Sequence, residues 1–289
     1  MHYIIVNELH LKGRNIKKLD TVKAVFDRAE IKYEVLKTTC RGHATELTKS
    51  ITKEGGHTIV AMGGDGTLHD ILNGFEDFDN NALGLIPFGT GNDFAASAGI
   101  PSDVRKAAEI IAFRAPSNID YIQLSNGLRS LNSVGMGIDV EVLKRVYAGN
   151  HHGKTKYVRS LLACLFKYNG FTFTAEFDGR KEKHCAIIGA LGNGKQLGGG
   201  IKLFPEAEIA DGYMNLIIVD YVSRIKLIGA VLKLKSGKIN TVKETTAVRV
   251  KSAKFTIEDS EFFIQAEGEL YKNVTIEAEV IHGRLKFYL

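Results

Sequence analysis

The stretch Met62-Gly63-Gly64-Asp65-Gly66-Thr67 decides the fold expected for this chain. Residues 57–61 before it form a short apolar run rich in branched side chains, which is typical of a buried parallel strand. Residues 68–75 after it place apolar side chains at helical spacing. A strand, a glycine loop and a helix in this order can hold a phosphate. Glycines let the backbone approach an anion, and the first N–H groups of the helix point toward it.

A second loop, Pro87-Phe88-Gly89-Thr90-Gly91-Asn92-Asp93, repeats this arrangement after the apolar run 82–86. A tight strand-to-helix turn is the simpler interpretation of either loop taken alone. Two such loops after neighbouring strands favour a ligand site, because ligands of open parallel sheets bind at the carboxyl ends of the strands.

Asp65 is the unexpected residue of the first loop, because a carboxylate repels phosphate. We expect this carboxylate to orient a cation, a ribose hydroxyl or a bound water, and we expect no packing role for it.

Length and composition indicate a globular protein of one large or two ordinary domains, with 289 residues of which 44% are hydrophobic and 25% charged. The net charge of +5 fits a nucleotide substrate or an anionic membrane surface, and there is no dense Lys/Arg run to indicate nucleic acid. No signal peptide is visible, and no apolar run approaches the roughly 18 residues of a transmembrane helix. The isolated cysteines Cys40, Cys164 and Cys185 lack metal spacing, so we expect inert thiols and a cytoplasmic protein.

Two halves of different character are visible in the patterns. Residues 1–122 alternate between strand and helix patterns, which predicts a parallel sheet covered by helices, and Ser102 is the expected N-cap of a helix over 102–113. Residues 123–289 are β-rich, and several segments alternate polar and apolar side chains as antiparallel strands do. The strands expected there are 131–136, 171–177, 184–191, 213–219, 254–258, 262–266 and 273–280, and the helices are 139–146, 157–166 and 225–234.

Several motifs of the β-rich half could carry chemistry. The glycine-dense segment 192–200 and the dipeptide Asp211-Gly212 each fit an ordinary loop or turn when taken alone. Glu267 lies in Gln265-Ala266-Glu267-Gly268-Glu269, for which a solvated acidic turn is the alternative to a catalytic carboxylate. His151-His152 are interpreted as loop residues, since a metal pair on a helix needs a spacing of three or four.

Taken together, these motifs resemble the diacylglycerol kinase catalytic-domain family, which contains soluble bacterial lipid kinases and sphingosine kinases. Gly-Gly-Asp-Gly-Thr at 63–67 and Pro-x-Gly-Thr-Gly-Asn-Asp-Phe at 87–94 are similar to its loops, and 38–44 matches its Thr-x-x-x-Gly-His-Ala pattern. Gly-Gly-Gly, Pro-x-Ala and Asp-Gly between residues 198 and 212 extend the resemblance. The first loop departs from the family's Asn-Pro-x-Ser-Gly, because the proline and serine are absent from 7–14.

The resemblance implies an α/β nucleotide-binding domain over 1–122, a β-sandwich-like lipid-substrate domain over 123–289, and an active site in the cleft between them. It implies that Asp211 binds a structural Mg²⁺ with the Tyr213 carbonyl as a second ligand. The residues that it assigns to the nucleotide are Thr38, Arg41, Gly63, Gly64, Gly66, Thr67, Gly89, Thr90, Gly91 and Asn92.

Two acidic residues are expected at the chemistry. Glu267 stands where the family carries an Asp taken as the general base, and Asp65 would organise the nucleotide or the catalytic Mg²⁺. The implied activity is a lipid kinase that transfers the γ-phosphoryl group of ATP to the hydroxyl of a diacylglycerol-like or other lipid alcohol. A NAD kinase-like activity and a catalytically impaired nucleotide-binding regulator are the alternatives.

The expected partners follow from that activity. They are ATP with Mg²⁺, a lipid alcohol and, transiently, a membrane surface, with a homodimer left open. The basic segment 145–159 could touch headgroups, and a solvated loop is the other interpretation of it.

Overall fold

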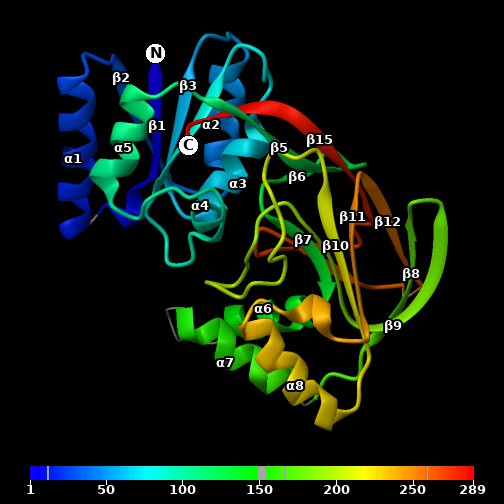
Figure 1. Ribbon diagram of the computed structural model, residues 1–289. Coiled ribbons are helices and arrows are strands. Elements are labelled where there is room, and N and C mark those ends of the chain that lie inside the picture. Colours follow the sequence, from blue (N-terminus) through cyan, green and yellow to red (C-terminus); the bar gives the residue numbers. More distant parts are fainter. Residues whose placement is uncertain (12, 149–153, 166, 259) are drawn as a thin grey trace. The chain divides into compact units, whose positions relative to one another are not determined.

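The computed structural model of the protein describes residues 1–11, 13–148, 154–165, 167–258 and 260–289, as traced in Figure 1. The chain folds into two compact units, which are 1–120 together with 283–289, and 121–282. Lys12 of the first loop and the His151-His152 pair lie outside the described residues.

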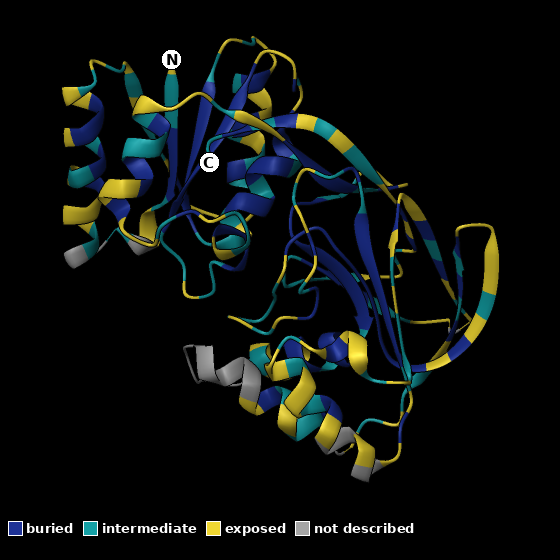
Figure 2. Cartoon of the chain, in the orientation of Figure 1, coloured by how far each residue is buried: buried dark blue, intermediate teal, exposed yellow. Residues whose placement is uncertain are grey.

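The first unit is built on a parallel sheet, as predicted. Its strands β1 (His2–Asn7), β2 (Tyr33–Thr38), β3 (Thr58–Gly63) and β4 (Ala82–Pro87) run in the order β2-β1-β3-β4. Its helices are η1 (Glu8–His10), α1 (Arg14–Arg28), α2 (His43–Thr52), α3 (Asp65–Gly74), α4 (Asp93–Ser97) and α5 (Val104–Phe113). Helix α1 packs with α5 and helix α2 with α3, and β3 and β4 are buried along their whole length (Figure 2).

The N-cap of helix α5 lies one residue later in the chain than predicted. Asp103 is the N-cap, because its side chain accepts a hydrogen bond from the Lys106 N–H at 2.9 Å. The prediction that Ser102 caps this helix is therefore wrong. Both side chains are good caps, and the backbone path decides between them.

The last strand, β15 (Ile276–Phe287), contributes residues to both units. Its end pairs parallel to β4, with Phe287 opposite Leu83, and the Phe287 ring packs edge-on against Phe94 at 5.4 Å between centroids. The structural division thus differs from the predicted 1–122 and 123–289 at the C-terminal end. Pairing between strands so distant in sequence leaves no local pattern from which to predict it.

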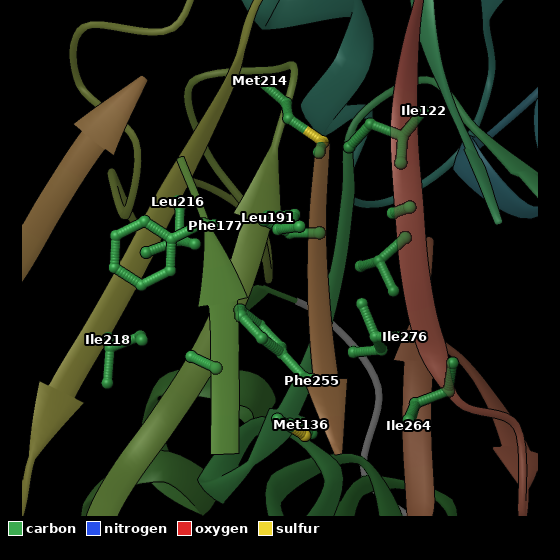
Figure 3. Packing of buried hydrophobic residues seen from close by; sticks show 14 of the residues in the cluster. Ile122, Met136, Phe177, Leu191, Met214, Leu216, Ile218, Phe255, Ile264 and Ile276 are labelled. Atoms are coloured by element: carbon green, nitrogen blue, oxygen red, sulfur yellow. The ribbon is translucent and has the colours of Figure 1, made fainter. Parts of the chain in front are cut away.

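The second unit is β-sandwich-like and antiparallel. Its strands follow the order β14-β13-β7-β9-β8-β12-β15, and β9 also pairs with β10, which pairs with β11. Their bounds are β5 (Ser117–Leu124), which begins in the first unit, β6 (Arg129–Ser130), β7 (Ser133–Gly137), β8 (Phe171–Phe177), β9 (Arg180–Gly192), β10 (Met214–Asp220), β11 (Thr245–Val250), β12 (Ser252–Ile257), β13 (Phe263–Ala266) and β14 (Glu269–Lys272). Alternate residues of these strands enclose a core that includes Phe255, Leu191 and Met214 (Figure 3).

Three helices cover part of this unit, namely α6 (Ile138–Ala148), α7 (Lys154–Leu165) and α8 (Arg224–Lys235), with the short η2 (Ile239–Thr241) after them. They enclose a second apolar cluster that includes Val142, Phe204 and Ile217. Elements occur at the segments predicted for this half, most of them with shifted boundaries, and β5, β6, β11 and β14 were not predicted. Within the described ranges, no helix combines the length and apolar character needed to cross a membrane.

Candidate functional site

The carboxyl ends of the parallel strands bring the predicted loops of the first unit together. Gly63 at the end of β3 is paired with Pro87 at the end of β4, so both glycine loops start at the same level of the sheet. Asn7 and Thr38 are paired in the same way at the ends of β1 and β2. The β3–α3 and β4–α4 loops are therefore neighbours, as the repeated strand-loop-helix pattern predicted.

Gly63 of the first loop and Gly89 of the second are required by close packing. A Cβ on Gly89 would lie 2.5 Å from the Gly64 Cα, so the two loops touch through their backbones. A Cβ on Gly63 would lie 2.4 Å from Oγ1 of Thr67, which folds back over the end of its own strand. Neither Gly63 nor Gly89 therefore has room for a side chain.

Asp65 caps helix α4 from the neighbouring loop. Its Oδ2 accepts the N–H of Asp93 at 3.1 Å, and its Oδ1 accepts the N–H of Phe94 at 3.1 Å. The first N–H groups of a helix have no partner inside the helix, and they favour an anion. The structure therefore gives Asp65 the packing role that sequence analysis did not expect, because its carboxylate is itself the anion at the start of α4.

Asn92, the residue before α4, is occupied within its own loop. Gly89 N–H donates to Asn92 Oδ1 at 3.0 Å, and Asn92 Nδ2 donates to the Gly89 carbonyl at 2.9 Å. Asn92 adopts the left-handed conformation at φ 54°, which asparagine tolerates. The second loop is closed by Asn92, and the cap of its helix comes from Asp65.

The start of helix α3 differs from the start of α4. The residue before α3 is Gly64, which makes no side-chain cap, and Gly66 in its first turn is exposed. A Cβ on Gly66 would meet nothing within 4 Å. The N-terminus of α3 thus has no side-chain cap, as is also true of α1 after Gly13 and α2 after Gly42, and exposed Thr90 lies on the loop adjacent to α3.

The β2–α2 loop supplies a positive charge near α3. Thr38 is buried at the end of β2, and Arg41 is exposed in the loop that follows. His69 on α3 is buried, and burial lowers its pKa to about 4, with the positive charge of Arg41 acting in the same direction. His69 is therefore neutral at physiological pH, and the charge at this loop is that of Arg41.

In the second unit, Glu267 lies in the tight turn between β13 and β14. Its Oε1 accepts hydrogen bonds from the Ser130 hydroxyl, from the Asn132 N–H at 2.6 Å and from the Ser133 N–H at 3.3 Å. The turn was predicted, but the side chain is half-buried and held by the β6–β7 segment instead of being solvated. Sequence analysis missed Ser130 and Asn132, because no motif marks a partner so far away in the chain.

Asp211 precedes β10 in the second unit, and its two oxygens have different partners. Oδ1 accepts the Tyr213 N–H at 3.0 Å, and Oδ2 lies 3.1 Å from the guanidinium of Arg249. That guanidinium also lies over the Tyr213 ring, 4.9 Å from its centroid. No group of three or more His, Cys, Asp or Glu side chains converges as a metal site in the part of the chain that the structure describes.

Comparisons with known proteins identify the family and the fold of the chain. Residues 2–124 match the model of the diacylglycerol kinase catalytic domain, and residues 132–289 match the YegS C-terminal NAD kinase beta sandwich-like domain. A diacylglycerol kinase of Bacillus subtilis (strain 168) is 32% identical over 248 residues, covering 83% of this chain and 82% of that protein. The chain belongs to the diacylglycerol kinase catalytic-domain family. As a member of this family of lipid kinases it is a kinase.

Two further relatives extend the similarity over nearly the whole chain. A probable lipid kinase YegS-like from Xanthomonas axonopodis pv. citri (strain 306) is 28% identical over 303 residues, covering 97% of this chain and 95% of that protein. The crystal structure of a putative diacylglycerol kinase from Bacillus anthracis str. Sterne has a TM-score of 0.82 at 23% identity, covering 99% of this chain and 94% of that one. Because the identity is only 23%, the similarity to this crystal structure supports the fold alone.

The capping role of Asp65 leads to a first prediction. Asp65→Asn should lower the free energy of unfolding by about 1–3 kcal/mol, because the amide offers one oxygen and turns its NH₂ toward the second N–H. Urea unfolding of the wild type and the variant measures this difference.

Asp103→Asn is the matched control, since Asp103 accepts one N–H and asparagine caps a helix equally well. It should change stability by much less than Asp65→Asn. Equal losses in the two variants would contradict the double cap.

Proposed function

We propose that this protein transfers the γ-phosphoryl group of ATP to the hydroxyl of a diacylglycerol-like or other lipid alcohol. Phosphoryl transfer asks the protein mainly for positioning and for neutralisation of charge. The proposal assigns the nucleotide to the loops of the first unit and the lipid to the second unit. Family membership and the geometry of each unit support it separately.

The nucleotide phosphates are assigned to the open start of helix α3. A helix N-terminus with a glycine before it attracts phosphate through its N–H groups and its dipole. Arg41 adds a positive charge near this helix. Asp65 holds the β3–α3 loop against the β4–α4 loop through its two hydrogen bonds. The further residues that we assign to the nucleotide are Thr38, Gly63, Gly64, Gly66, Thr67, Gly89, Thr90, Gly91 and Asn92.

An apolar cavity in the second unit is the observation that carries the lipid part of the proposal. It is partly open to solvent, and its walls come from α6, α7, α8, β9, β10, η2 and the loop segment 197–203. The side chains that line it are aliphatic apart from Asp139. Removing a methylene group from water stabilises a complex by about 0.8 kcal/mol. Such a cavity suits a hydrocarbon chain and offers nothing to a nucleotide.

A substrate dissolved in a bilayer requires transient contact with the membrane surface, which we include in the proposal. Phosphorylation with labelled ATP of vesicles containing diacylglycerol, monoacylglycerol or sphingosine tests the function. We expect label in the lipid extract. Label on NAD⁺ would instead support the NAD kinase alternative, and ATP binding without transfer would support the regulator.

Glu267 is proposed as the acceptor of the proton from the lipid hydroxyl. A general base contributes about 10²- to 10⁴-fold to the rate. Glu267→Gln should lower kcat by that factor, because the amide keeps an oxygen for the donors of residues 130–133 but is not basic. Glu267→Asp should retain more activity than the amide, because its carboxylate is only displaced.

The competing role, an anchor for the β6–β7 segment, predicts the reverse order. Glu267→Gln would then be active and stable, while Glu267→Asp, one methylene too short for its donors, would lose stability. Steady-state kinetics with thermal melting of both variants separates the two roles.

Mg²⁺ enters the proposal in two places. One ion accompanies ATP and neutralises charge on the transferred phosphoryl group. A second, structural ion is assigned to Asp211 and the Tyr213 carbonyl, since Mg²⁺ in proteins is often held by one carboxylate and several waters. For this ion to bind, Arg249 must leave the Asp211 carboxylate. The Arg249 side chain is 56% exposed and that of Asp211 is 19% exposed, so solvent reaches the pair from the arginine side. An ion pair at the surface contributes about 0–1 kcal/mol.

The proposed competition can be measured without nucleotide. Mg²⁺ should raise the melting temperature of the wild type, and it should raise that of Arg249→Gln by more, because the variant has no guanidinium to displace. Asp211→Asn should abolish the response. Equal responses of the wild type and Asp211→Asn would contradict the assignment.

A further inference from the structure

The turn that carries Glu267 has a backbone that needs support. Glu267 and Gly268 both adopt the left-handed conformation, with φ of 54° and 82°. This conformation is unfavourable for a residue such as glutamate, and it persists only where the surroundings impose it. The position of the Glu267 carboxylate therefore depends on the groups that hold this turn.

Two side chains hold the turn through Gly268. Gln265 Oε1 accepts the Gly268 N–H at 3.0 Å, and the Tyr147 hydroxyl donates to the Gly268 carbonyl at 2.6 Å. The first bond fixes the peptide that joins Glu267 to Gly268, and the second fixes the peptide that follows. The Glu267 N–H also donates to the Ser133 carbonyl, at 3.2 Å, so β7 holds the other side.

Gln265 links this turn to the wall of the apolar cavity. Gln265 is 4% exposed, and it lies opposite Gly135 in the antiparallel pairing of β13 with β7. A Cβ on Gly135 would lie 2.3 Å from Asp139 Oδ2 and 3.2 Å from Gln265 Nε2. The missing side chain of Gly135 thus leaves the space in which the carboxyl and the amide lie next to each other.

Asp139 is a buried acid that the proposed function has not used. Its side chain lines the cavity, Oδ1 accepts the Val140 N–H at 2.9 Å, and the Gln265 amide is the polar group next to the carboxyl. Burial raises the pKa of Asp139 to about 7, and the neighbouring Gln265 amide acts in the opposite direction. With its oxygen directed to Gly268, the Gln265 amide presents its NH₂ end to this acid.

We propose that Gln265 and Tyr147 are positioning residues that set the Glu267 carboxylate, and that they do so by tying its turn to helix α6. Asp139, near the start of α6, lies next to Gln265, and Tyr147, near its end, donates to the Gly268 carbonyl. The two ends of the helix are therefore both connected to the turn. Ile138 and Asp139 of the same helix line the cavity. The helix that contacts a hydrocarbon chain in the cavity is then the helix that places the proton acceptor.

The inference rests on the proposed role of Glu267, and its first test measures kinetics. Gln265→Met keeps the length of the side chain and removes both of its polar contacts. It should lower kcat for the lipid alcohol by about 10- to 100-fold, the range for a small misplacement of a reacting group, and leave the KM for ATP unchanged. Tyr147→Phe removes only a hydroxyl from a side chain that is 56% exposed, so it should fold normally and lower kcat by a smaller factor.

A double variant separates positioning from an independent effect. If Gln265 acts through Glu267, adding Gln265→Met to Glu267→Gln should cost no further activity, because the base that it positions is already gone. The same holds for Tyr147→Phe. Losses that multiply in the double variants would overturn the proposal.

Hydrogen exchange provides a readout that does not depend on catalysis. The Gly268 N–H should exchange faster in Gln265→Met than in the wild type, because its acceptor is lost. Gln123→Met, which makes the same replacement on β5 of the same unit, should leave this exchange unchanged. Unchanged exchange at Gly268 in Gln265→Met and Tyr147→Phe would contradict the positioning role. If Glu267→Gln is fully active while the Gly268 N–H exchanges faster in Gln265→Met, the assignment of Glu267 as the base is refuted and the support of its turn by Gln265 is not.

Discussion

The candidate site of the first unit depends on one carboxylate. Asp65 accepts two N–H groups at the start of α4, and through them it locks the β3–α3 loop to the β4–α4 loop. The glycines around it permit this contact, since Gly64 and Gly89 approach through their backbones. The same carboxylate occupies the start of α4. The start of α4 is satisfied by an anion of the chain itself, whereas the start of α3 has no side-chain cap and is the one that we propose for a phosphate.

In the second unit a glycine also makes room for a carboxylate. Gly135 leaves out a side chain, and the space is filled by the polar ends of Asp139 and Gln265. A buried acid is tolerated at this position because it lies beside an amide and a backbone N–H, although burial still raises its pKa to about 7. In both units a glycine leaves room for a carboxylate, since Gly91 lies against Asp65 and Gly135 against Asp139.

Sequence periodicity predicted the elements well where their pattern is local. The parallel strands before both glycine loops, the alternating antiparallel strands and the three helices of the second unit are all found. The choice of Asp103 over Ser102 as a cap, and the return of β15 to the sheet of the first unit, were not predicted. Neither is encoded in a periodic pattern, since one depends on the backbone path and the other on pairing across the whole chain.

The sequence by itself determined the order of strands and loops, the family and the residue types available at each loop. It could do so because hydrophobic periodicity and glycine spacing are properties of short segments. Only the tertiary structure decided the partners of those residues. Asp65 caps α4, Asp211 pairs with Arg249, and Glu267 accepts hydrogen bonds from residues 130–133. Sequence patterns did not predict these contacts, because each joins segments far apart in the chain. A carboxylate in a motif has no fixed role until the fold determines which N–H group or cation lies opposite its oxygens.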